Sequence, residues 1–118
     1  MILRCKKCGI EITSELTQLT DEGSLRYEDG KEMIERGMFF ISSGEYQPER
    51  NGDFIVNLKD LINSKLTDNG SRLNGCCGLD GLDGMNLLCV NGHEIGTERS
   101  DCWMSHHAVI STENANTA

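Results

Sequence analysis

The feature that most constrains this chain is a pair of cysteines near its start. Cys5 and Cys8 are separated by two lysines and followed by Gly9. Two cysteines at this spacing can bind one metal ion, while backbone N–H groups of the turn hydrogen-bond their sulfurs. A tetrahedral zinc site needs two more ligands, and the next cysteines lie about seventy residues further on. The pair therefore predicts a structural zinc site that ties the N-terminus to the last third of the chain.

The second half of this predicted site is less regular than the first. Its first candidates are Cys76 and Cys77, which are adjacent. Neighbouring residues in extended backbone point to opposite sides, so only one of the two is expected to bind the metal. Cys77 is slightly favoured, because it precedes Gly78 as Cys8 precedes Gly9.

Three residues compete for the fourth position: Cys89, His93 and Cys102. Asn91-Gly92 is a strong signal for a two-residue hairpin loop, which would place Cys89 and His93 on opposite faces. The two should then not share a metal, and we choose Cys89. The predicted metal ligands are thus Cys5, Cys8, one of Cys76 and Cys77, and Cys89.

Two other uses of the cysteines compete with zinc. A redox Cys-x-x-Cys usually opens a helix, whereas residues 9–12 look like a strand. Disulfides would require export, but residues 1–5 lack the pattern of a signal peptide, and no apolar run approaches the ~20 residues of a membrane span. We therefore expect a cytoplasmic protein, in which six cysteines are more often metal ligands than disulfides.

The composition predicts one small domain with many turns. The chain has 118 residues, of which 37% are hydrophobic, and it contains 13 glycines and one proline. Such a core is lean, and a metal cross-link would offset the shortfall. We expect a single zinc-stabilised domain over residues 1–110 and a flexible tail over residues 111–118, which are small and polar.

The hydrophobic pattern predicts a β-rich α+β fold built on a small antiparallel sheet. Strands are expected within residues 2–13, 33–41, 54–56, 86–97 and 103–110. One short helix is expected over residues 58–66, where four apolar side chains recur at helical spacing after Asn57 as the N-cap. The two cysteine half-sites resemble zinc-ribbon or β-tent knuckles in a general way, over a handful of residues, and no family follows from them.

The charge restricts the partners. The formal net charge is −8, and the only basic side chain after Arg72 is Arg99. Affinity for phosphate groups comes from clustered lysines and arginines, so neither nucleic acid nor a membrane surface is expected as a partner. A basic protein partner fits this charge, although acidity also serves solubility. The pattern leaves the oligomeric state open.

Two functions are consistent with these features. The first is a non-catalytic protein-interaction domain with a structural metal. The second is a metal- or thiol-dependent enzyme that uses Cys102 with His106 or His107. On a strand Cys102 and His106 would share a face, which allows a nucleophile and a base. A buried cysteine beside surface histidines is the simpler interpretation, and the sequence contains no established catalytic motif.

Overall fold

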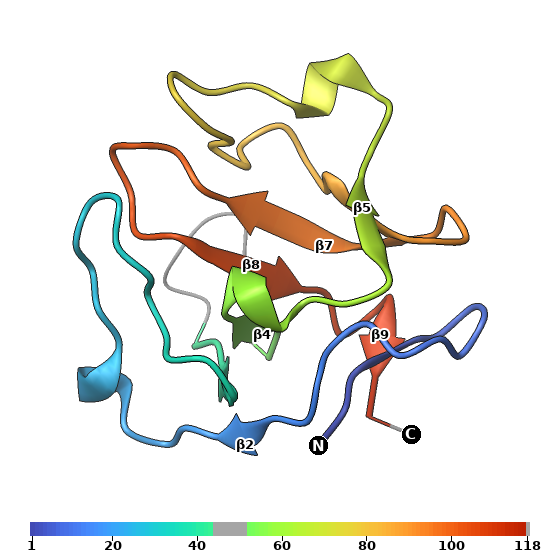
Figure 1. The fold of residues 1–118 in the computed structure, drawn as a ribbon, viewed down its shortest axis with the longest axis horizontal. Helices are drawn as coiled ribbons and strands as arrows, with labels where there is room; N and C mark the ends of the chain where they lie inside the picture. Colours follow the sequence, from blue (N-terminus) through green and yellow to red (C-terminus); the bar gives the residue numbers. More distant parts are fainter. Residues whose placement is uncertain (44–51, 118) are drawn as a thin grey trace.

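The computed structural model describes residues 1–43 and 52–117 as a β-rich domain (Figure 1). Within these residues a mixed seven-stranded sheet forms the centre. Only the β2–β3 pair is parallel, and every other neighbouring pair is antiparallel. In spatial order the strands are β2 (Thr17–Gln18), β3 (Met38–Ile41), β4 (Phe54–Val56), β8 (His107–Ile110), β7 (Glu94–Arg99), β6 (Leu87–Cys89) and β5 (Ser64–Leu66).

A two-stranded sheet joins the two ends of the chain. Strand β1 (Arg4–Cys5) pairs antiparallel with β9 (Ala115–Asn116), so the termini lie near each other (Figure 1). Residues 111–118, for which we expected a flexible tail, include β9, and residue 118 lies outside the described residues. Ala115 is buried opposite Cys5, because β1 offers an edge whose backbone groups need a partner.

The main core lies between the central sheet and the N-terminal segment. Central strand β8 is buried at all four positions, as expected for a strand covered on both faces. The largest fully buried apolar side chains of this core are Leu3, Ile12, Val56, Ile95 and Ile110. A second, smaller cluster contains Leu25, Met33, Ile34 and Ile55.

The helix that we expected over residues 58–66 is wrong. Asn57 does cap a turn, since its side chain accepts a hydrogen bond from the Lys59 N–H, but the turn is a 3-10 helix of only three residues (Leu58–Asp60). Strand β5 then begins at Ser64 and pairs with β6. The described residues form no α-helix. Their other short helices are 3-10 turns at Glu22–Ser24 and Gly70–Arg72.

The reason is that tertiary hydrogen bonds replace those of a helix. The buried Asp60 carboxylate accepts from the Gly37 N–H at 2.7 Å, and the Asp60 carbonyl accepts from the Ser14 N–H. Asn63 then adopts a φ of 49°, which ends any right-handed turn. Leu66, which we assigned to the apolar helical face, is 43% exposed.

Gly96 provides a test of how tightly the central strands are packed. A Cβ at Gly96 would overlap the carbonyl oxygen of Val109 on β8, whereas a Cβ at Gly70 would meet open space. We expect Gly96→Ala to lower the free energy of unfolding by about 1–3 kcal/mol, as overpacking does. Gly70→Ala should change it by no more than about 0.5 kcal/mol. Urea unfolding of both variants checks this, and equal midpoints would contradict the packing of β7 on β8.

Candidate metal centre

Four side chains from distant parts of the chain meet at one edge of the core. The sulfurs of Cys5, Cys8 and Cys89 and the imidazole of His93 place one ligand atom each within 4.8 Å of all the others. The Cys8 and Cys89 sulfurs are 3.8 Å apart, and Nδ1 of His93 lies 3.6 Å from the Cys5 sulfur and 3.4 Å from the Cys89 sulfur. This group could hold a metal ion.

These three separations match those between ligand atoms of a tetrahedral coordination shell. A metal with sulfur bonds of about 2.3 Å and nitrogen bonds of about 2.1 Å holds its ligand atoms about 3.5–3.8 Å from one another. Hydrogen bonds to sulfur are weak and do not by themselves draw three thiols and an imidazole together. The three measured separations therefore fit a group that could hold a four-coordinate metal ion.

The first pair of ligands lies on a tight turn at the N-terminus. The Gly9 N–H donates to the Cys5 carbonyl at 2.8 Å, and the Cys5 N–H donates to the Ile10 carbonyl at 3.0 Å. Gly9 has a φ of 75°, which glycine adopts without steric cost. The turn aims both sulfurs to one side. Cys5 is buried against the core and Cys8 is exposed.

The second pair lies on the β6–β7 hairpin, and here our expectation about faces is wrong. The loop contains three residues, 90–92, because the Gly92 N–H donates to the Cys89 carbonyl and the Cys89 N–H donates to the His93 carbonyl. With Gly92 at a φ of 87°, this is a three-residue turn ending in a left-handed residue. Cys89 and His93 are then direct partners, and partners point to the same face.

Asn91, within this loop, acts on the exposed thiol. Its side-chain N–H donates to the Cys8 sulfur at 3.3 Å. This hydrogen bond and one from the Ile10 backbone lower the pKa of Cys8 to about 6. Burial raises the pKa of Cys5 above its usual value. Cys8 is thus largely a thiolate at neutral pH, which is the form that binds metals.

The C-terminal segment links the two halves of the centre. The Asn114 carbonyl accepts from the Lys6 N–H at 3.0 Å, and its side-chain N–H donates to the Glu94 carbonyl at 3.0 Å. Lys6 lies between the first two cysteines, and Glu94 directly follows His93. One residue therefore contacts the backbone beside both ligand pairs.

Cys76 and Cys77, from which we expected one ligand, are not part of this group. Cys77 is joined by a disulfide to Cys102, with Cα atoms 5.8 Å apart, and Cys76 is a free, exposed thiol. The error arose because we grouped the cysteines by their spacing in the sequence. Spacing does not show that loop 74–84 folds back on residues 100–102. That packing is close: a Cβ at Gly78 would overlap the Ser100 carbonyl.

Asp101 organises this disulfide-linked loop. Its carboxylate is fully buried and accepts from the N–H groups of Cys76, Cys77 and Cys102, at 2.7–3.0 Å, and from the Trp103 indole at 2.8 Å. The N–H groups of Cys77 and Cys76 lower the pKa of Asp101 to about 2. Although Asp101, Cys77 and Cys102 lie close enough to surround an ion, both carboxylate oxygens are already occupied and the two sulfurs are bonded to each other.

The predicted nucleophile and bases do not meet. The Cys102 sulfur is in the disulfide, Nε2 of His106 lies 2.9 Å from the Asp101 carbonyl, and Nδ1 of His107 lies 3.1 Å from the Ser105 carbonyl. Among the described residues no hydrogen bond joins Cys102 to either histidine.

Sequence reasoning missed three residues that contact or belong to the two cysteine groups. His93 was weighed and rejected because of the assumed loop length; a three-residue loop ending at Gly92 would have retained it. Asn91 was seen only as a turn residue, and Asp101 was overlooked, although its position directly before Cys102 was a signal that a carboxylate lies among the cysteines.

Comparison with known proteins gave no relative. No family model, curated protein or solved structure matches this chain. No helix in the described part of the chain has the length and apolar character needed to cross a membrane.

The role of Asp101 can be tested through the single tryptophan. We expect Asp101→Asn to lower the midpoint of urea unfolding and to shift the indole N–H resonance of Trp103, because an amide nitrogen cannot accept the lost hydrogen bonds. Since folding lowers this pKa, the carboxylate stabilises the protein above its ordinary pKa of 3.8 and loses this effect as the pH falls toward 2. The gap between wild type and variant should close over that range.

Asp83→Asn is the matched control. Asp83 is exposed and accepts one hydrogen bond, from the Asn74 side chain. The control should leave the indole resonance in place. An unmoved resonance in Asp101→Asn would show that Asp101 does not hold Trp103.

Proposed function

We propose that Cys5, Cys8, Cys89 and His93 bind one structural Zn²⁺, and that the chain is a zinc-stabilised binding domain rather than a metalloenzyme. The observation that supports this most directly is the spacing of 3.4–3.8 Å among the sulfur and nitrogen atoms. Three thiolates and one imidazole are a ligand set typical of structural zinc. The first knuckle is the zinc-ribbon-like part of this proposal.

The number and burial of the ligands support a structural role. Catalytic zinc sites have three protein ligands and an open position for water, whereas four protein ligands fill a tetrahedral shell. Cys89 and Cys5 are 0% and 1% exposed, which keeps solvent from that side of the site. Binding would also relieve the repulsion among three thiolates that lie this close.

Binding of another protein is the role that we propose for the domain as a whole. The net charge of −8 favours a basic partner. A cytoplasmic setting is part of the proposal, because the zinc site requires three reduced cysteines. The Cys77–Cys102 disulfide argues against this setting, because the cytosol keeps most cysteines reduced. The alternative enzyme, with Cys102 as nucleophile, receives little support, because that sulfur is in a disulfide and neither His106 nor His107 contacts it.

Metal content and thiol counting test the zinc site. Protein purified without added metal should contain one zinc per chain. Of the four free cysteines, only Cys76 should react with a thiol reagent before chelation, and Cys5, Cys8 and Cys89 should react after it. Removal of zinc should unfold the domain, since such binding contributes about 10–16 kcal/mol. Four thiols that react equally in the untreated, folded protein would refute the site.

Two serine variants distinguish a cysteine that binds zinc from one that does not. Cys8→Ser removes an exposed ligand and should abolish stoichiometric zinc and cooperative unfolding, whereas Cys76→Ser removes an equally exposed thiol outside the group. Cys76→Ser should retain one zinc and the wild-type melting temperature. Equal behaviour of the two variants would show that exposure of the thiol, not coordination, decides the outcome.

Asn91 should tune the affinity for zinc. Asn91→Ala removes the N–H that contacts the Cys8 sulfur, and loss of such an outer partner typically costs about 10- to 100-fold in metal affinity. Competition with a chromophoric chelator measures this loss. Asn69→Ala, which removes an exposed turn-capping side chain outside the group of four ligands, serves as the control and should bind zinc like the wild type.

A further inference from the structure

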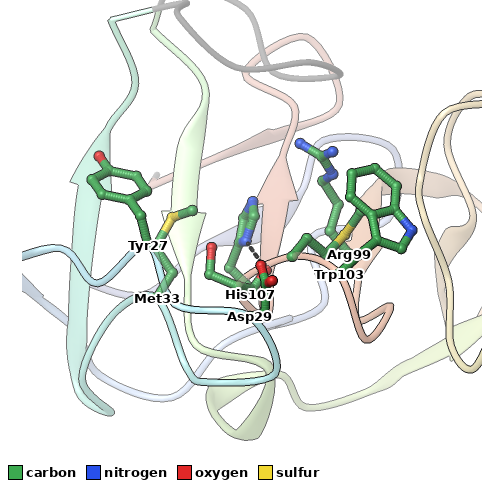
Figure 2. A pocket seen from close by; sticks show the side chains of 8 residues that line it. Tyr27, Asp29, Met33, Arg99, Trp103 and His107 are labelled. Carbon is green, nitrogen blue, oxygen red and sulfur yellow. Dashed lines mark hydrogen bonds between the residues drawn. The ribbon is translucent and has the colours of Figure 1, made fainter.

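A cavity of about 230 Å³ opens beside the central strands. Its lining comes from the loop before β3 (Tyr27, Asp29 and Met33), the end of β7 (Arg99), the segment before β8 (Trp103) and the start of β8 (His107) (Figure 2). It shares no residue with the metal centre. For scale, a cavity of about 150 Å³ is large enough to hold benzene. The space therefore suits one aromatic ring with small substituents.

His107, which lines this cavity, has one buried ring nitrogen without a hydrogen-bond partner in the described structure. Nδ1 lies 3.1 Å from the Ser105 carbonyl, which can only accept, so Nδ1 carries the proton. Burial, followed by the nearby charge of Arg99, lowers the pKa of His107 to about 4, and the ring is neutral at pH 7. Its other nitrogen, Nε2, is then an acceptor. It is buried and has no hydrogen-bond partner in the described structure.

An acceptor in this state is rare and costly, because buried polar groups are almost always paired. The His107 side chain is 1% exposed, so bulk water does not satisfy Nε2. The flexible thioethers of Met33 and Met104 also line the cavity. Unbranched side chains of this kind can move aside for an entering group.

Arg99 adds a positive charge on the same face. Arg99 and His107 are direct partners in the antiparallel β7–β8 pair, so their side chains project from the same side of the sheet. Figure 2 shows His107 between Met33 and Tyr27 on one side and Arg99 and Trp103 on the other. The Trp103 ring is 51% exposed and offers a flat apolar surface. Asp29, an exposed residue of the same lining, carries a negative charge, opposite in sign to the charge of Arg99.

We propose that this cavity binds a small anionic aromatic molecule that carries one hydrogen-bond donor. The donor pairs with Nε2 of His107, the anionic group lies toward Arg99, and the ring packs on Trp103. Each element of the lining thereby has a counterpart in the ligand: acceptor with donor, cation with anion, and indole with ring. The site is independent of the zinc proposal, because the two sites have no residue in common.

The probes are 3- and 4-hydroxybenzoate, titrated to millimolar concentration into the full-length protein as purified. Because the chain has one tryptophan, the indole N–H resonance of Trp103 reports binding at the cavity. Benzoate lacks the donor and 4-hydroxybenzyl alcohol lacks the anion. At least one hydroxybenzoate should shift the resonance saturably and bind about tenfold more tightly than benzoate, as loss of one hydrogen bond predicts. The alcohol should bind more weakly as well.

Two variants distinguish specific recognition of the probes from non-specific binding. His107→Phe should bind hydroxybenzoate and benzoate equally, since the acceptor is gone. If this variant does not fold, Asp29→Asn decides: removing an exposed negative charge should tighten binding of the anionic probes about threefold and leave the neutral alcohol unchanged. Absence of a saturable shift with either hydroxybenzoate, or anion binding that Asp29→Asn does not strengthen, would overturn the proposal. Metal content measured in the same samples separates failure of this site from failure of the zinc site.

Discussion

The close approach of three sulfurs and one imidazole is the constraint on which the rest of the structure depends. Thiolates this close would repel one another, and the cation that we propose at this site would offset that repulsion. The four groups come from two hairpin-like turns about eighty residues apart in sequence. Around that point the chain needs little regular structure. Its strands are short, its helices are single 3-10 turns, and β9 closes the domain by pairing with the strand that contains Cys5.

The loops are held by individual buried acceptors rather than by repeating backbone ladders. Asp60 anchors the turn that replaced the expected helix, and Asp101 gathers three backbone N–H groups and an indole. A buried carboxylate is costly unless fully hydrogen-bonded, and Asp101 meets that condition. Irregular segments can be ordered in this way when the apolar core is small.

Sequence patterns within one short segment predicted structure better than patterns meant to show which distant residues meet. The β-rich class followed from the strand patterns. The set of residues that meet at the candidate metal site could not be predicted in the same way, because it depends on loop length and on tertiary contacts. One residue of loop length decides whether His93 faces Cys89, since strand faces alternate. The apolar spacing of residues 58–66 suits a helix, but the hydrogen bonds of Asp60 to other segments override that preference.

The two central strands connect the metal centre with the cavity. Strand β7 starts directly after His93 and ends at Arg99, while β8 starts at His107 and leads into the turn that contains Asn114. In Figure 1 the two ends of this pair lie on opposite sides of the molecule. Strands β7 and β8 are paired along their length, and the Asn114 side chain after β8 donates to the Glu94 carbonyl beside His93. The pairing at that end is therefore continuous with the register that places Arg99 beside His107 at the other. A structural metal would therefore serve the cavity through the register of the sheet, without contact between the two sites.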